Sequence, residues 1–155
     1  MTKTNAVRML EAAEILFSTF EYEVDENDLS GETAAKKINA EADAVFKTLV
    51  ARNEVNEVCV FCIPVTMELN LKKAARASGS KSIALIHVKE LLTLTGYIRG
   101  GCSPVGMKKK FPTFLDETAQ LFETIFVSAG VRGMQIRLSP LDLQKMTEAE
   151  FADLT

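Results

Sequence analysis

The sequence predicts an α+β fold with a mixed, largely antiparallel sheet. Segments with helical spacing of apolar residues are short, and they alternate with many short apolar or alternating runs. Several of these runs are separated by tight turns, which favours antiparallel pairing. Apolar residues are 47% of the 155-residue chain and charged ones 25%, as is typical of a soluble globular protein. This length predicts a single domain over residues 1–155.

The N-terminal part predicts two helices separated by an extended segment. The first helix is expected to begin after an N-cap at Thr4. We expect its core-facing side to comprise Ala6, Met9, Leu10, Ala13, Leu16, Phe17 and Phe20. The alternating residues 20–24 predict a strand, and Ser30 or Thr33 is expected to begin the second helix.

The middle of the chain predicts a hairpin followed by a helix. Residues 44–50 are expected to pass from a helix end into a strand, and residues 53–57 to form a hairpin-like turn. The continuous apolar run 58–63 is typical of a strand that is buried on both faces. Residues 67–77 predict a helix that ends at Gly79.

The C-terminal half predicts shorter elements. We expect strands at 83–86, 113–116, 123–128 and 134–138, and helical segments at 88–94, at 117–122 and after Ser139. In residues 134–138 alternate side chains point to opposite faces, so Gln135 and Arg137 should face away from the core. Ser139 and Pro140 have the residue types of an N-cap and a first helical position.

Charge and cysteine content limit the class of protein. The N-terminus lacks the apolar segment of a signal peptide, and no apolar run approaches the length of a membrane span. Three cysteines without a secretory signal predict a reducing, cytoplasmic location. A net charge of −3 argues against a protein that coats nucleic acid, so any such contact should be local.

The stretch 95–106 contains the strongest local signal for a binding site. Four of its residues are glycine, at positions 96, 100, 101 and 106. Glycine in such numbers indicates positive φ angles or a close approach to the backbone. One interpretation is a loop of exposed N–H groups that binds an anionic or carbonyl-bearing ligand, with lysines 108–110 nearby. The other is a bulge and turn that only redirect the chain. Neither the P-loop nor the dinucleotide motif is present.

Other chemistry-bearing residues have a structural and a functional interpretation. Cys59 and Cys62 would point to opposite faces of a strand, so we predict no metal site and no redox pair there. Cys102 with His87 could form a nucleophile–base pair, although a chance pairing is the more common outcome. Lys47, between apolar residues, is either a partly buried cation for a phosphate or oxyanion, or an ordinary surface lysine.

Several segments, in order along the chain, match the pattern of a known family. They are FEYEVD at 20–25, VFKTL at 45–49, PV at 64–65, LNLKK at 69–73, TGY at 95–97, GGCSPVG at 100–106, PTFLD at 112–116, VSAG at 127–130 and RG at 132–133. The chain resembles the YbaK/EbsC family of aminoacyl-tRNA deacylases, which are relatives of the editing domain of bacterial prolyl-tRNA synthetases. The resemblance runs from Thr4 to the C-terminus.

This resemblance implies a fold, an activity and a set of site residues. It implies a curved mixed sheet flanked by helices, and hydrolysis of mischarged tRNA, typically cysteine on proline tRNA. It implies no cofactor. The family lysine falls on Lys47, its tyrosine on Tyr22, its glycine pair on Gly100 and Gly101, and its serine on Ser128.

The chain departs from the family pattern at three positions. Gln135 stands where an acid is frequent, which puts in doubt any role for a carboxylate there. Cys102 replaces a frequent isoleucine, which favours a packing role over a nucleophilic one. Met107 stands where glutamine is frequent.

An activated ester requires positioning more than a protein nucleophile. We expect Gly100 and Gly101 to direct backbone N–H groups at the ester carbonyl, and Lys47 to hold oxygens of the terminal adenosine. Tyr22 and Ser128 would shape the pocket. The thiol of a cysteinyl substrate could attack its own ester, since well-oriented intramolecular reactions reach effective molarities of ~10⁵–10⁸ M.

Additional contacts and partners follow from the same interpretation. Hydrogen-bonding side chains of the glycine-rich stretch, Thr95, Tyr97 and Ser103, are expected to contact the substrate. The expected partners are the acceptor end of tRNA and a synthetase, such as prolyl-tRNA synthetase, that supplies tRNA affinity. Two alternatives remain open: a deacylase for alanine, serine or threonine on tRNA, and a non-catalytic module that binds a nucleotide or a protein.

Overall fold

The computed structural model describes residues 3–155. In chain order its elements are α1 (Asn5–Ala12), β1 (Phe17–Glu21), α2 (Gly31–Lys37), η1 (Ala42–Ala44), β2 (Phe46–Asn53), β3 (Val58–Pro64), α3 (Leu71–Ala77), β4 (Ile83–Leu85), η2 (Val88–Glu90), α4 (Leu91–Thr95), β5 (Thr113–Asp116), η3 (Glu117–Leu121), β6 (Ile125–Ser128), β7 (Met134–Leu138), α5 (Pro140–Thr147) and β8 (Glu150–Ala152), where η marks a 3₁₀ helix. The predicted α+β class is confirmed. No helix in this part of the chain combines the length and apolar character that a bilayer span requires.

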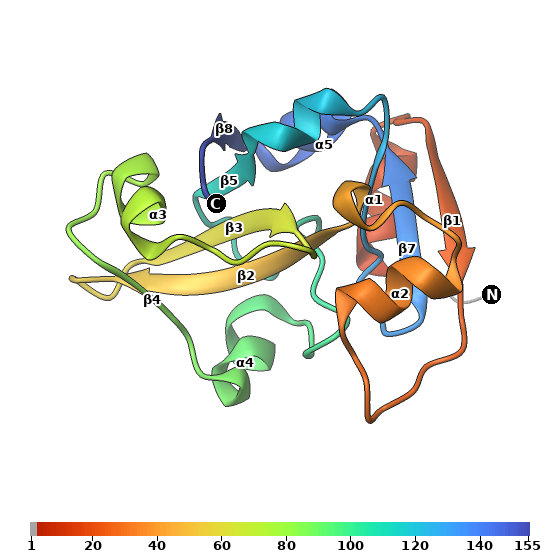
Figure 1. Ribbon diagram of the computed structural model, residues 1–155, viewed down its shortest axis with the longest axis horizontal. Coiled ribbons are helices and arrows are strands. Elements are labelled where there is room, and N and C mark those ends of the chain that lie inside the picture. Colours follow the sequence, from red (N-terminus) through yellow and green to blue (C-terminus); the bar gives the residue numbers. More distant parts are fainter. Residues whose placement is uncertain (1–2) are drawn as a thin grey trace.

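The strands form two sheets instead of one. The larger sheet has the order β4-β2-β3-β5-β8, and the smaller one β1-β7-β6. Figure 1 shows the long β2–β3 hairpin lying across the molecule, with β1 and β7 running steeply beside its end. An isolated bridge between Val45 and Phe126 connects the two sheets. Among the strand pairs of residues 3–155, only β3–β5 and β5–β8 are parallel, so the predicted mixed, largely antiparallel pairing is confirmed.

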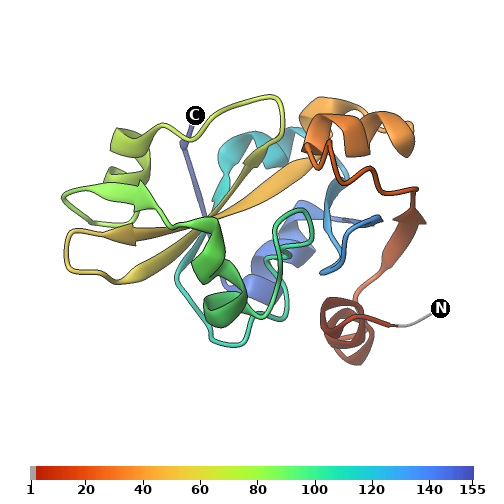
Figure 2. The same ribbon diagram turned by 90° about the horizontal axis from the view of Figure 1, so that it is seen from below.

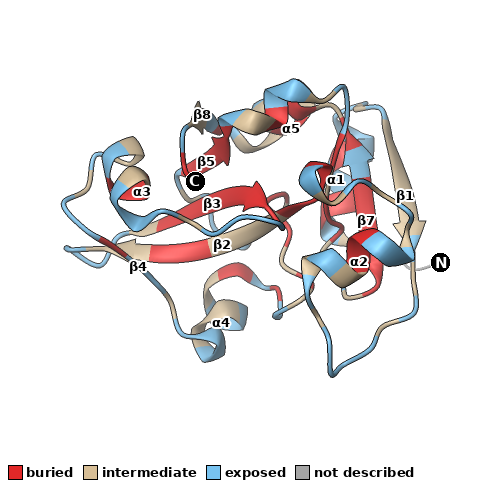
Figure 3. Cartoon of the chain, viewed as in Figure 1, coloured by how far each residue is buried: buried red, intermediate tan, exposed pale blue. Residues whose placement is uncertain are grey.

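Strand β3 is buried on both faces, as its continuous apolar sequence predicts. Val60 and Cys62 point into the larger core cluster, which also contains α1 and the inner faces of β6 and β7. Cys59, Phe61 and Ile63 point into a second cluster beneath α3. The two cysteines therefore lie on opposite faces of the strand, and both are free thiols. Figure 3 shows most of β3 and the first part of β7 buried, whereas the outer helical faces are exposed.

Three helices begin at the predicted N-caps. The side chains of Thr4, Ser30 and Ser139 each accept a hydrogen bond from a backbone N–H in the first turn of α1, α2 and α5. These capping bonds satisfy N–H groups that have no partner within the helix. The predicted hairpin is also present, and β2 and β3 pair antiparallel from Phe46–Pro64 to Arg52–Val58.

The predicted first apolar helical face is wrong beyond Ala12, and within the helix Met9, predicted to be in the core, is 40% exposed. Helix α1 ends at Ala12, and Glu14 takes a left-handed conformation with φ +57°. Leu16, predicted to be in the core, is 88% exposed. Phe17 instead begins strand β1, whose backbone pairs with β7. Pairing with β7 outweighs the weak local preference for continuing the helix.

Two further differences concern the ends of elements. Helix α3 begins at Leu71 and not at residue 67, because the Asn70 side chain caps it by accepting a hydrogen bond from Lys73 N. Residues 150–152 form the unpredicted strand β8, which pairs in parallel with β5. Three residues carry too little periodicity to predict a strand, so only the neighbouring edge of β5 reveals it.

A buried carboxylate fixes the C-terminal segment. Asp116 is fully buried at the end of β5. Its Oδ1 accepts a hydrogen bond from Leu154 N at 2.9 Å, and its Oδ2 accepts one from Thr118 Oγ1 at 2.5 Å. A buried charge is stable only when such bonds satisfy it.

Asp116→Ala should therefore lower the free energy of unfolding by about 3 kcal/mol, because it leaves the Leu154 N–H buried without an acceptor. Urea unfolding followed by circular dichroism measures this change in a chain that contains no tryptophan. The control is Asp153→Ala, since Asp153 pairs with Lys73 at an exposed position and such pairs contribute less than about 1 kcal/mol. Equal losses for the two variants would contradict the assignment.

Candidate active site

A cavity of about 400 Å³ opens beside strand β2. Figure 2 shows α2 and the η2–α4 segment on either side of this strand. The wall consists of residues from these elements, from the 99–102 loop and from the adjoining β6 and β7. The volume lies within the range of roughly 300–1,000 Å³ that is usual for small-molecule sites.

Lys47 contributes a cation to this cavity. It lies near the start of β2, where the backbone pairs with Ile63, and the residue is half-buried and lines the cavity. Within residues 3–155, no carboxylate forms an ion pair with its ammonium group. A half-buried cation without a protein counter-ion attracts phosphate or developing oxyanion charge. Among the described residues that line the cavity, the only acid is Glu32, which is exposed.

The two adjacent glycines have different roles. Gly100 lines the cavity with φ +82°, a conformation that favours glycine. Gly101 is buried outside the cavity wall, and its N–H donates to Ile98 O at 2.9 Å. The expectation that both N–H groups face a substrate is therefore corrected: the Gly101 N–H is already used within the loop. A Cβ at Gly101 would lie 2.9 Å from the backbone N of Arg132, so glycine is required there for close packing.

Three predicted substrate-binding residues do not line the cavity. Thr95, Tyr97 and Ser103 are buried, and each hydrogen-bonds within its own loop. Thr95 Oγ1 donates to Leu91 O at 2.8 Å, Tyr97 OH donates to Val105 O at 2.6 Å, and Ser103 Oγ accepts from Val105 N at 3.2 Å. These bonds and their burial hold the glycine-rich loop in shape, so the structure does not bring the three residues to the cavity.

The structure does bring four predicted residues together. Tyr22, Lys47, Gly100 and Ser128 line the same cavity, although they come from separate parts of the chain. Tyr22 follows β1, and its backbone N–H donates to Gly133 O at 2.9 Å. Ser128 ends β6, and its Oγ accepts from Gly130 N at 3.2 Å. These bonds place both residues at the turn between β6 and β7.

Sequence patterns did not identify every residue of the cavity wall. Thr48, Arg99 and Gln135 also line it. Alternation in β7 correctly places Gln135 on the face opposite the core, but that face is the cavity wall and not solvent. The sequence did contain one sign that Gln135 belongs to the site: it stands at a position where the family frequently has an acidic residue.

Cys102 lies in the cavity wall as a protonated thiol. Burial raises its pKa to about 12. The thiolate is the nucleophilic form, so little of it exists at neutral pH. His87 is exposed and outside the wall, so the structure does not assemble the Cys102–His87 pair. Within residues 3–155, no cluster of three or more histidine, cysteine or acidic side chains is arranged to hold a metal ion.

Comparison with known proteins identifies the family. Residues 26–146 match the aminoacyl-tRNA editing domain family. The chain belongs to this family. It is also 47% identical over 153 residues to a protein of Enterococcus faecalis, named EbsC and described as a candidate Cys-tRNA(Pro)/Cys-tRNA(Cys) deacylase. That alignment covers 99% of this chain and 93% of the relative, which agrees with the predicted resemblance.

More distant relatives of this editing-domain chain support the same assignment. A solved structure described as a candidate trans-editing enzyme for prolyl tRNA synthetase superposes with a TM-score of 0.82 at 25% identity, covering 100% of this chain and 99% of that one. A proline–tRNA ligase of Brachyspira hyodysenteriae is 29% identical over 83 residues, which are 54% of this chain and 14% of the ligase. Sequence similarity to this chain thus extends to a short part of a much larger protein.

Cys102→Ala should lower the deacylation rate by at most about tenfold, because a buried protonated thiol only packs against the cavity. Loss of a true nucleophile costs as much as about 10⁶. The measurement is kcat/KM for deacylation of mischarged tRNA. The control is Cys59→Ala, since Cys59 is buried in the other core cluster. A loss near the larger figure for Cys102→Ala alone would show that this thiol is the nucleophile.

Proposed function

We propose that this chain removes misattached amino acids from tRNA in trans, with Cys-tRNA(Pro) as its main substrate. The observation that carries the proposal is the cavity, which combines the unneutralised Lys47 ammonium, the Gly100 backbone and a protonated thiol. This set suits an ester that needs orientation and charge stabilisation instead of a protein nucleophile. The described activity of EbsC and membership of the editing family support the same substrate class.

Lys47 would bind oxygens of the terminal adenosine. Its ammonium offers three donors and a full charge at a half-buried position, where a phosphate or hydroxyl oxygen of the substrate can reach it. The Gly100 N–H, which forms no hydrogen bond within the described part of the chain, would donate to the ester carbonyl. Tyr22 and Ser128, which line the same cavity, would help to enclose the adenosine and the amino acid.

For a cysteinyl ester, the substrate thiol would act as the nucleophile. Its sulfur attacks the carbonyl carbon, so a C–S bond forms as the C–O bond to the ribose breaks. The thiol proton passes to the ribose oxygen, which leaves as a hydroxyl, and the product is a cyclic thiolactone that water later opens to cysteine. No cofactor is needed, because the ester is already activated and the nucleophile lies in the same molecule.

The tRNA would contact the protein only at its acceptor end. A chain with net charge −3 is not suited to wide contact with a polyanion. We propose that a synthetase such as prolyl-tRNA synthetase delivers the tRNA in the cytoplasm, and that residues 1–155 act as one editing domain. Such an arrangement supplies affinity through the partner, since linked binding sites raise the effective concentration of the tRNA end.

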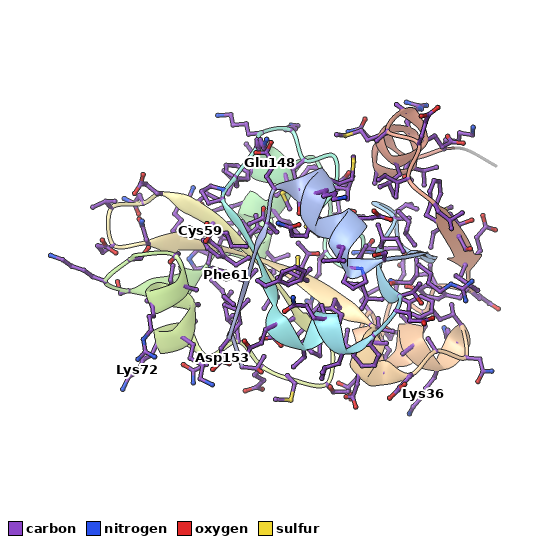
Figure 4. The ribbon with its side chains drawn as sticks, turned by 90° about the horizontal axis from the view of Figure 1, so that it is seen from above. Lys36, Cys59, Phe61, Lys72, Glu148 and Asp153 are labelled. Atoms are coloured by element: carbon purple, nitrogen blue, oxygen red, sulfur yellow. The ribbon has the colours of Figure 1, made fainter. Side chains whose placement is uncertain are left out.

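Lys47→Ala should lower kcat/KM for deacylation of Cys-tRNA(Pro) by about 10²-fold or more, the typical effect of removing one preorganised charge-stabilising donor. Lys72→Ala is the matched control, because Lys72 is exposed on α3 and outside the cavity wall. Figure 4 shows its side chain projecting outward from that helix. Unchanged deacylation by Lys47→Ala would remove the assigned role of this cation.

Cysteine should be removed faster than serine or alanine from the same tRNA. Serine differs from cysteine by oxygen in place of sulfur, and alanine has no side-chain nucleophile. A rate advantage of at least about tenfold for cysteine is expected if the substrate thiol attacks its own ester. The assay incubates each charged tRNA with pure protein and subtracts its spontaneous hydrolysis.

The same panel, extended to threonine, separates the alternative functions. Equal rates for cysteine and alanine would exclude the thiol route as the main mechanism. Preferred removal of alanine, serine or threonine would identify a deacylase of different specificity. Failure to release any amino acid would favour a binding module that retains the fold.

A further inference from the structure

One residue of the cavity wall, Gln135, has a buried side-chain oxygen without a partner in the protein. Gln135, on β7, is 6% exposed. Among the described residues, its Oε1 is the one buried side-chain nitrogen or oxygen atom without a hydrogen-bond partner. Buried acceptors are nearly always paired, because leaving one unpaired costs free energy. An unpaired oxygen in a cavity wall therefore indicates a donor that arrives with a ligand.

The surroundings of Gln135 place it in the enclosed part of the site. Its backbone lies between Phe20 of β1 and Ser128 of β6 in the smaller sheet. Ser128 is also buried and lines the same cavity, whereas Arg137, the next residue on that face of β7, is exposed. Arg99, at another part of the wall, is exposed as well. On this face of β7, Arg137 is therefore in contact with solvent, whereas Gln135 lies in the cavity wall.

The enclosed position decides which part of a charged tRNA can reach Gln135. The terminal nucleotide remains attached to the rest of the tRNA, so it must stay toward the open side. The aminoacyl group is the end of the molecule and enters furthest. The donor present on every aminoacyl ester is the α-amino group. The thiol of cysteine is a weak donor and would compensate the buried oxygen poorly.

We propose that Gln135 is a substrate-binding residue whose Oε1 accepts a hydrogen bond from the α-amino group of the aminoacyl ester. This inference rests on the proposed function. Among the described residues of the wall, the only acid is Glu32, which is exposed. No buried carboxylate of the wall would therefore form an ion pair with the amine, and the hydrogen bond to the neutral amide of Gln135 would orient it. Holding the amine would fix rotation about the bond between the α-carbon and the carbonyl carbon, and so direct the side-chain thiol at the ester.

The test combines a change in the protein with a change in the substrate. Two esters are prepared on the same tRNA: cysteinyl, and 3-mercaptopropionyl, which keeps the thiol and the ester but lacks the amine. Single-turnover rates are measured for the original protein and for Gln135→Leu, which keeps the approximate size of the side chain but removes the acceptor. The original protein should cleave the desamino ester about tenfold more slowly than the cysteinyl ester, as expected for one net hydrogen bond.

The interaction predicts a specific non-additive result. Gln135→Leu should cleave the cysteinyl ester about tenfold more slowly than the original protein does. It should cleave the desamino ester at almost the same rate as the original protein. Gln135→Glu retains an acceptor and should keep the preference for the cysteinyl ester. A loss of the same size on both esters for Gln135→Leu would overturn the proposal, since a purely structural role does not distinguish them.

Failure of the inference and failure of the proposed function are distinguishable. If the original protein cleaves the cysteinyl ester but Gln135→Leu affects both esters equally, only the role of Gln135 is wrong. If the original protein cleaves neither ester, the proposed function is overturned and this inference with it. Circular dichroism of each variant identifies any loss that comes from misfolding.

Discussion

Close contact between two backbone segments organises the site. Gly101 packs so tightly on the turn at 131–132 that any Cβ would meet backbone atoms at 2.9 Å. Arg132 Nε adds a hydrogen bond to Arg99 O at 2.8 Å across the same contact. This contact holds the 99–102 loop, and therefore Gly100, against the end of the smaller sheet that carries Ser128 and Gln135. Any residue other than glycine at position 101 would push the 99–102 loop away from this turn, and the cavity would lose the wall that this loop forms.

The buried side chains of the glycine-rich stretch support this contact from behind. The side chains of Thr95, Tyr97 and Ser103 form hydrogen bonds with nearby backbone atoms. Tyr97 also packs beside Gly130, where a Cβ would lie 2.8 Å from its ring. Burial raises the pKa of Tyr97 to about 12, so its hydroxyl remains a neutral donor to the Val105 carbonyl. These residues act on a substrate only through the shape of the loop.

The residues of the cavity are suited to orienting a substrate and not to attacking it with a protein nucleophile. The buried thiol is protonated, the histidine lies elsewhere, and Lys47, a cation without an ion-pair partner among the described residues, is held on a strand whose backbone pairs with β3. A rigid strand fixes a charge more accurately than a loop does. An aminoacyl ester is already activated, and a cysteinyl ester also carries a nucleophile, so an enzyme that orients both has little need for further groups.

Local sequence determined the elements whose signals are strong and short in range. The N-caps at Thr4, Ser30 and Ser139 have the side-chain chemistry that begins a helix, and the unbroken apolar run of β3 is typical of a strand that is buried on both faces. The family resemblance added Lys47, Tyr22, Gly100 and Ser128, which the fold does bring to one cavity. Tertiary structure alone decided three other features. Phe17 lies outside the helix and pairs with β7, and the Gly101 N–H donates to Ile98 O. The face of β7 that carries Gln135 is a cavity wall. Each of these depends on which distant segment lies alongside, and neither periodicity nor residue type carries that information.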